Sequence, residues 1–242
     1  MTGTAVPERI RQAVAALDVR AGDRLLEVGC GGGVAVGLVC PLLITGTITA
    51  VDHSATATAR AVRRNAGSIG DGRATIATAA FTEPGLTAAG ISGRSFDKIF
   101  AINVNLFWTG PARAELALAA GLLAPGGALY AFYEPPGERL DELAAKVTGT
   151  FEAGGFTAEV LRLPAPVVGI VGRPWAAPDG RPATPRHGTP RHRLGTIAAQ
   201  TRPKTCARSP PRAPPTTLLL DSTTRPLRVV GAARPIPGVQ LS

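Results

Sequence analysis

Two short segments near the N-terminus combine glycines and carboxylates in a way that suits a nucleoside ligand. Glycines occupy positions 29, 31, 32 and 33, directly after the short segment 25–28. Glycines at a turn from strand to helix permit positive φ and let the backbone approach a ligand closely. Asp52 ends a second apolar run 23 residues after Gly29, where a carboxylate can accept hydrogen bonds from both hydroxyls of a ribose. The spacing predicts a site for a cofactor that contains ribose.

Two residues near the loop bear on which cofactor it binds. The dinucleotide fingerprint requires glycines at 29, 31 and 34, whereas position 34 is a valine. Glu27 lies where a carboxylate would repel a pyrophosphate and attract an amino group. Both observations disfavour an NAD(P)-dependent oxidoreductase. Asp52 by itself does not separate the alternatives, because it suits any cofactor that contains a ribose.

The elements that would position these residues alternate between strands and helices. Strands are expected at 25–28, 47–51, 74–78, 96–102 and 128–133, and helices at 7–17, 34–43, 55–66, 111–123 and 138–153. Gly67 is expected to end the third helix, and the Pro-Gly-Gly run at 125–127 to form a turn. Strands separated by helices pair in parallel, and two nearby strand-like segments, 156–163 and 167–171, can add an antiparallel hairpin at one edge. The pattern predicts an open α/β sheet.

Four segments in this order resemble the class I S-adenosylmethionine-dependent methyltransferases. The segments are LLEVGCGGG, ITAVDHS, FDKIFAINVNLFW and LLAPGGALYAFYEP, and the resemblance covers about residues 5–173. It implies a Rossmann-like, seven-stranded, mostly parallel sheet with helices on both faces and an antiparallel last strand. It also implies that the protein is an enzyme and that its cofactor is S-adenosylmethionine.

The same resemblance implies which residues contact the cofactor. They are Glu27, Gly29, Cys30, Gly31, Gly33, Asp52, His53, Ala79, Ala80 and Phe81. Many relatives carry an aspartate after the third strand that holds the adenine amino group, whereas this chain reads TIATAAF there. Backbone or stacking contacts from residues 78–81 are therefore expected to take the place of that carboxylate. His53 is expected to be a solvated neighbour of Asp52 and not a base.

The acceptor side is expected where the fourth strand ends, beside the activated methyl group of the cofactor. Asn103 is the candidate catalytic residue, as a polar group that positions the acceptor, and Asn105, Phe107 and Trp108 are candidates for the acceptor site. The run Asn103–Leu106 is not an N-P-P-Y motif, which disfavours methylation of DNA adenine. Glu134 is expected to be a surface acid. About 170 ordered residues leave little room for a substrate domain, so the expected acceptor is a small molecule.

The positive charge of the chain is confined to its C-terminal segment. The net charge is +9, and residues 174–242 contain 11 of the 26 basic residues but only 2 of the 17 acidic ones, so residues 1–173 are neutral overall. Thirteen of the 22 prolines also lie in 174–242. Such a segment cannot bury enough apolar surface to offset its ordering entropy. We therefore expect a methyltransferase domain at 1–173 and a disordered Pro/Arg-rich tail at 174–242.

Composition also restricts partners and location. A nucleic-acid-binding protein acting through the tail is an alternative, but Trp175 is the only aromatic residue there, so non-specific contact is the most that we expect. Cys30, Cys40 and Cys206 lack the spacing of metal ligands, and no metal is expected. The uncharged run Val28–Val51 is broken by glycines and a proline, which argues against a membrane span. The expected location is the cytoplasm.

Overall fold

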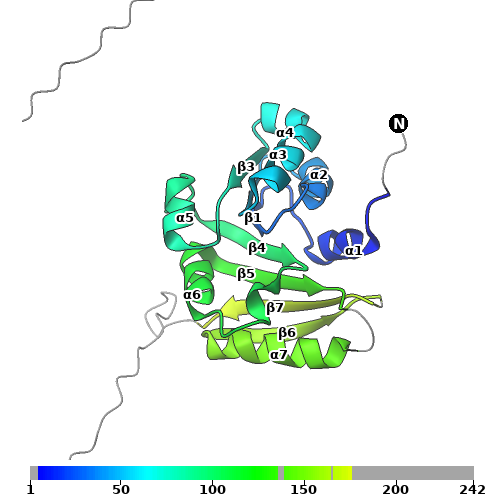
Figure 1. The fold of residues 1–242 in the computed structure, drawn as a ribbon, viewed down its shortest axis with the longest axis vertical. Coiled ribbons are helices and arrows are strands. Elements are labelled where there is room, and N and C mark those ends of the chain that lie inside the picture. Colours follow the sequence, from blue (N-terminus) through cyan, green and yellow to red (C-terminus); the bar gives the residue numbers. More distant parts are fainter. Residues whose placement is uncertain (1–4, 136–138, 165, 176–242) are drawn as a thin grey trace, which may run out of the picture. The chain divides into compact units, whose positions relative to one another are not determined.

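The computed structural model describes residues 5–135, 139–164 and 166–175, which belong to one compact unit (Figure 1). Seven strands form one sheet in the order β3-β2-β1-β4-β5-β7-β6. Strands β1 to β5 pair in parallel, and β7 pairs antiparallel with both β5 and β6. The Rossmann-like sheet and its antiparallel last strand are therefore as expected. Apart from its first two residues, the tail at 174–242 lies outside the described residues, so its disorder remains a prediction.

The bounds of the elements follow the expected alternation closely. The first half contains α1 (Glu8–Ala16), β1 (Arg24–Val28), α2 (Val34–Val39), η1 (Cys40–Leu42), β2 (Thr47–Asp52), α3 (Ala55–Arg64), α4 (Ala66–Gly70) and β3 (Ala74–Thr78). The second half contains α5 (Glu83–Ala88), β4 (Phe96–Ile102), η2 (Asn105–Phe107), α6 (Arg113–Leu122), β5 (Leu123–Tyr133), α7 (Leu140–Ala153), β6 (Phe156–Arg162) and β7 (Val168–Pro174).

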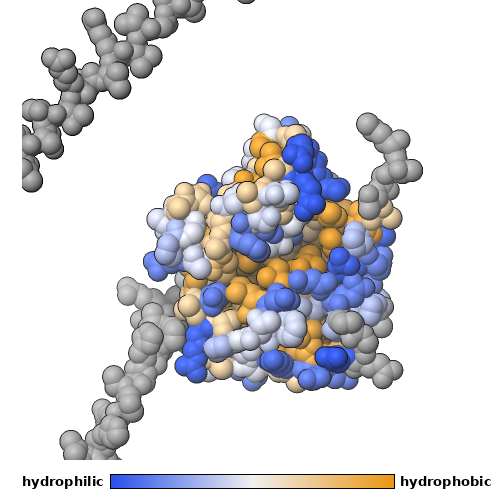
Figure 2. All heavy atoms as spheres, in the orientation of Figure 1, coloured by the Kyte–Doolittle hydropathy of each residue, from blue (hydrophilic) through white to orange (hydrophobic). Residues whose placement is uncertain are grey.

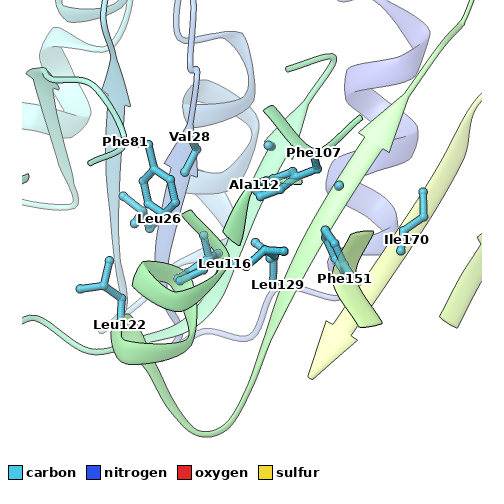
Figure 3. Packing of buried hydrophobic residues seen from close by; sticks show 14 of the residues in the cluster. Leu26, Val28, Phe81, Phe107, Ala112, Leu116, Leu122, Leu129, Phe151 and Ile170 are labelled. Atoms are coloured by element: carbon cyan, nitrogen blue, oxygen red, sulfur yellow. The ribbon is translucent and has the colours of Figure 1, made fainter. Parts of the chain in front are cut away.

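Two hydrophobic cores cover the two faces of the sheet. Successive side chains of a strand point to opposite faces, so Leu26 and Val28 of β1 enter one core and Leu25 enters the other. The first core is completed by α5, α6 and α7, and Figure 3 shows part of its packing. The second core is completed by α1, α2 and α3. Both faces of the parallel strands are thus buried, which explains why these strands read as apolar runs.

Two local expectations were wrong, and one helix was not expected. The helix expected at 55–66 divides at Asn65, whose φ of −109° and ψ of 22° are not helical, and Gly67 lies inside α4 instead of ending a helix. The Pro-Gly-Gly run at 125–127 is part of β5, where the pairing with β4 is irregular between Phe96 and Lys98. Helix α5 was not anticipated, although Thr82 caps it by accepting a hydrogen bond from the Gly85 N–H. The helix divides at Asn65 because the side chain of this residue binds the Gly33 carbonyl oxygen, a contact that is distant in sequence.

Candidate active site

The glycine loop joins β1 to α2 at the carboxyl end of the sheet. The N–H groups of Gly29 and Cys30 donate to the Val51 carbonyl oxygen at 2.8 and 3.0 Å, which anchors the loop to β2. Gly29, Gly31 and Gly33 have positive φ, a region that side chains disfavour. A Cβ at Gly31 would meet nothing within 4 Å, so the backbone at this point faces open space. A ligand can therefore approach the main chain of the loop directly.

Gly33 has a different role, because it allows α3 to pack against the loop. A Cβ at this position would lie 2.5 Å from Nδ2 of Asn65 and 2.8 Å from Cβ of Ala61. The buried Asn65 amide donates to the Gly33 carbonyl oxygen at 2.9 Å, and Arg64 Nε donates to the Gly32 carbonyl oxygen at 3.0 Å. Sequence reasoning missed both residues, because nothing in the sequence pairs them with a loop more than 30 positions away. They hold the loop in its open conformation.

Glu27 is a buried carboxyl group without a hydrogen-bond partner for Oε2 among the described residues. Burial is the main cause that raises its pKa from 4.5 to about 8, and the nearby charge of Asp52 adds to the effect. Burial, together with the charges of Glu27 and Asp52, also raises the pKa of Cys30 to about 12, so that thiol stays protonated. An unsatisfied buried carboxyl is costly unless a ligand supplies the missing donor. Glu27 therefore fits a site for a cationic or N–H-bearing group.

Asp52 is fixed at the end of β2 by two backbone hydrogen bonds. Its Oδ2 accepts from the N–H of Gly31 at 2.9 Å, and its Oδ1 accepts from the N–H of Ser54 at 2.9 Å. Carboxylate oxygens can accept more than one hydrogen bond each, so both remain able to receive ribose hydroxyls. His53 lies beside Asp52, with Nδ1 3.7 Å from Oδ1, and 86% of its side chain is exposed. The structure thus places Asp52 next to the glycine loop and His53 at the solvent edge.

Residues after β3 continue this edge of the site. The Ala79 N–H donates to the Asp52 carbonyl oxygen at 3.0 Å, which brings the two segments together. Ala80 is exposed, so its backbone is open to a ligand. Phe81 is only 8% exposed and lies in the first core beside Leu26 and Val28 (Figure 3). Its ring therefore has little free surface for stacking, and the predicted contacts of residues 79–81 with adenine remain a prediction.

A cavity of about 320 Å³, called here the acceptor cavity, lies beside the ends of β4 and β5 and the start of α7. Its lining residues are Asn103, Asn105, Trp108, Tyr133, Glu134, Pro135, Arg139, Glu142, Leu143 and Lys146. Three of the four acceptor-side candidates, Asn103, Asn105 and Trp108, are thus brought together. Figure 2 shows apolar surface bordered by hydrophilic side chains across the face of the molecule between the region of α2–α4 and that of α7.

Phe107 is the exception among these candidates. It was expected to form a wall for the acceptor, but its side chain is fully buried and does not line the cavity. Its ring packs edge-on against Phe151 of α7, with 5.3 Å between centroids and 86° between planes (Figure 3). Asn105 and Trp108 beside it line the cavity, whereas the Phe107 side chain is directed into the first core. Phe107 therefore supports the cavity from beneath.

Asn103 connects the ends of the two central strands. Its φ is +54°, a conformation that asparagine tolerates better than most residues. The Asn103 N–H donates to the Phe132 carbonyl oxygen, and its Oδ1 accepts from the Glu134 N–H, both at 2.8 Å. Val104, the next residue, lies against Gly29, since a Cβ on that glycine would be 2.5 Å from Val104 Cγ2. The acceptor cavity is therefore adjacent to the glycine loop.

The aromatic wall of the cavity is held in a fixed orientation. Trp108 Nε1 donates to Oδ1 of Asn105 at 3.1 Å, and Nζ of Lys146 lies 5.8 Å from the centroid of the indole ring. Such contacts restrain a half-buried tryptophan at both its edge and its face. Asn105 therefore fixes the edge of the Trp108 ring in the cavity wall.

Seven of the ten cavity residues were not among the sequence candidates for the site, and Tyr133 and Glu134 are two of them. Tyr133 is 4% exposed, and its hydroxyl has no hydrogen-bond partner among the described residues. Glu134 was expected to be a surface acid; its side chain is 32% exposed and also lines the cavity, and Arg9 Nη1 of α1 donates to its Oε2 at 2.9 Å. Figure 1 shows α1 at the end of the sheet toward which β4 and β5 run. In the sequence, the one signal for Tyr133 and Glu134 is their position at the end of the strand expected at 128–133, where ligands bind in sheets of this type.

Two further properties concern only the part of the chain that the structure describes. No group of three or more His, Cys, Asp or Glu side chains is arranged to hold a metal ion in that part. None of its helices combines the length and apolarity needed to cross a membrane.

Comparisons with known proteins agree with this geometry. Residues 25–127 match the family model described as a methyltransferase domain. No curated protein sequence matches the chain. Many solved structures are similar to the chain in fold.

Three of these structures illustrate the similarity. The mitomycin 7-O-methyltransferase MmcR is 16% identical, with 69% of this chain and 53% of that one covered and a TM-score of 0.54, so the chain spans about half of its length. The SAM-dependent O-methyltransferase from Thermotoga maritima is 16% identical over 72% and 67% of the two chains, with a TM-score of 0.53. The precorrin-6y C5,15-methyltransferase from Geobacter metallireducens is 16% identical over 72% and 93%, with a TM-score of 0.54.

Proposed function

We propose that the chain is a class I S-adenosylmethionine-dependent methyltransferase and that its acceptor is a small molecule bound in the acceptor cavity, because residues 25–127 match a methyltransferase domain. The observation that carries the proposal is the position of this cavity, which adjoins the glycine loop through Asn103 and Val104. Methyl transfer requires the acceptor to lie in line with the methyl group and near contact with it. A cavity beside the glycine loop supports the proposal because it would place an acceptor close to a cofactor bound there.

The residues around the loop fit S-adenosylmethionine. Glu27 offers an unsatisfied buried carboxyl for the amino group, the open backbone at Gly31 and Gly32 leaves room for the ligand, and Asp52 is fixed where a ribose can reach it. When bound, the cofactor supplies an activated methyl group. The protein itself binds and orients, and the buried surroundings of Glu27 strengthen its attraction to a cationic group. Cys30, with its raised pKa, contributes backbone and not a thiolate.

The dimensions and lining of the acceptor cavity support a small acceptor. Pockets for small ligands have volumes of roughly 300–1,000 Å³ and combine apolar walls with a few polar groups. The acceptor cavity, at about 320 Å³, is at the lower end of that range and combines Trp108, Pro135 and Leu143 with polar neighbours. Asn103 is proposed as the polar group that positions the acceptor.

A titration followed by a screen tests the proposal. Isothermal titration with S-adenosylmethionine should give binding to the wild-type protein and a loss of roughly 10- to 100-fold in affinity for Asp52→Ala, as expected for a charge-assisted hydrogen bond. Asp71→Ala, a change of an exposed aspartate distant from the loop, is the matched control. A screen of small molecules with methyl-labelled cofactor should then yield a product whose formation Trp108→Ala weakens through KM. Equal affinities for both aspartate variants, or transfer only to macromolecules, would contradict the proposal.

A further inference from the structure

Methyl transfer to a neutral hydroxyl group leaves a proton that some group must accept, and the acceptor cavity contains two carboxylates, Glu134 and Glu142. Glu134 follows β5 directly, and its N–H is bound by Asn103 at 2.8 Å. Through Asn103 it is connected to the end of β4 and so to the side of the cavity nearest the glycine loop. Glu142 lies on the first turn of α7, away from that connection.

The ion pair with Arg9 orients the carboxylate of Glu134 but occupies only one of its two oxygens. Arg9 binds Oε2, and no described residue forms a hydrogen bond with Oε1. The side chain of Glu134 is 32% exposed, so a proton taken up at Oε1 has a path to solvent. A fixed carboxylate with one free oxygen in a cavity wall has the geometry of a general base.

The remaining walls indicate what kind of hydroxyl compound fits. Trp108, Pro135 and Leu143 provide flat or apolar surface in a space of about 320 Å³, which suits a single substituted aromatic ring. The buried Tyr133 hydroxyl lacks a partner, and a hydroxyl oxygen on the acceptor would supply one. Burial raises the pKa of Tyr133, so its hydroxyl stays protonated and acts as a donor.

We propose that the acceptor is a small aromatic hydroxyl compound and that Glu134 accepts its proton, an inference that rests on the function proposed above. The acceptor oxygen forms a bond to the methyl carbon while the methyl–sulfur bond breaks, and the electron pair of that bond stays on sulfur. The hydroxyl proton passes to Oε1 of Glu134 and then to solvent. Tyr133 donates a hydrogen bond to the acceptor oxygen, and Arg9 is a positioning residue that holds Oε2.

Two probes separate a proton acceptor from a structural residue. para-Cresol is protonated at neutral pH, whereas para-nitrothiophenol is already ionised there and needs no base. Glu134→Gln should lower kcat for para-cresol by about 100-fold or more while changing kcat for para-nitrothiophenol by less than about threefold. The acid limb of the pH–rate profile with para-cresol should disappear in the same variant. Binding of S-adenosylmethionine, measured by isothermal titration, should stay at the wild-type value.

Two other carboxylates serve as controls: Glu152, which lies outside the cavity, and Glu142, which lies within it. Glu152→Gln, at an exposed position near the end of α7, should leave both rates unchanged. Equal losses with both probes in Glu134→Gln, or a selective loss in Glu142→Gln instead, would overturn the role of Glu134. A wild-type protein that methylates other small molecules but neither probe would overturn the acceptor class and leave the proposed function standing. Absence of cofactor binding, or of any methylated small molecule, would remove the proposed function itself.

Discussion

Replacing Glu27 by glutamine keeps the shape of the side chain but removes the charge that the buried site can acquire. In the cofactor-free protein, burial and the charge of Asp52 raise the pKa of Glu27 from 4.5 to about 8. The folded protein therefore retains a proton that the unfolded chain releases above pH 4.5. Stability is unaffected below that pH and falls as the pH rises toward 8. The difference between the two pKa values corresponds to at most about 5 kcal/mol.

The same pKa sets the pH dependence of cofactor binding. A cationic group on the ligand pairs with the ionised carboxylate, so only the ionised fraction of Glu27 is ready to bind. With a pKa of about 8, that fraction is about one half at pH 8 and about one hundredth at pH 6. The wild-type dissociation constant for S-adenosylmethionine should therefore be about 50-fold larger at pH 6 than at pH 8. Glu27→Gln should bind more weakly at pH 8 and show little dependence on pH.

Isothermal titration at several pH values measures both effects, because repeating each titration in buffers of different ionisation enthalpy counts the protons released. Wild-type protein at pH 7 should release most of one proton per cofactor bound, and the glutamine variant none. Urea denaturation across pH 5–9 measures the stability term in the absence of cofactor. The reasoning fails if the wild-type affinity is constant between pH 6 and 8, or if the glutamine variant shows the same dependence on pH.

Five further substitutions test the roles of the loop and the cavity. Gly33→Ala should reduce the free energy of unfolding by about 2–4 kcal/mol in urea denaturation, because its Cβ collides with α3, whereas Gly31→Ala should cost about 1 kcal/mol and mainly weaken cofactor binding. Asn65→Ala should lower stability by about 2–3 kcal/mol, since it removes two buried hydrogen bonds, and unchanged thermal unfolding would contradict this. Phe107→Ala should cost about 3–5 kcal/mol, and Trp108→Ala should leave stability nearly intact but raise KM for the acceptor. If Phe107→Ala instead raised KM and Trp108→Ala instead lowered stability, the cavity would lie on the Phe107 side of η2.

Much of the cofactor half could be predicted because its signals are local. The glycines at 29–33 need positive φ or open space, and the carboxylate of Asp52 must follow a strand that lies next to β1. In a parallel sheet, neighbouring strands bring their carboxyl ends to one edge, so the order of the elements already places Asp52 beside the loop. The acceptor half is less predictable. The place of Asn103, Asn105 and Trp108 after the fourth strand indicated that they would lie together, whereas Phe107 was assigned to the cavity and lies in the core.

The sequence by itself determined the alternation of strands and helices, the parallel sheet with its antiparallel end, and the glycine loop with its two carboxylates. These follow from periodicity and from backbone conformations that only some residues tolerate. Only the tertiary structure decided that Asn65 braces the loop, that Phe107 enters the core and that Arg9 meets Glu134 across 125 positions. Such contacts depend on which face of an element is turned inward and on which distant element packs there, and neither is encoded within a local window of sequence.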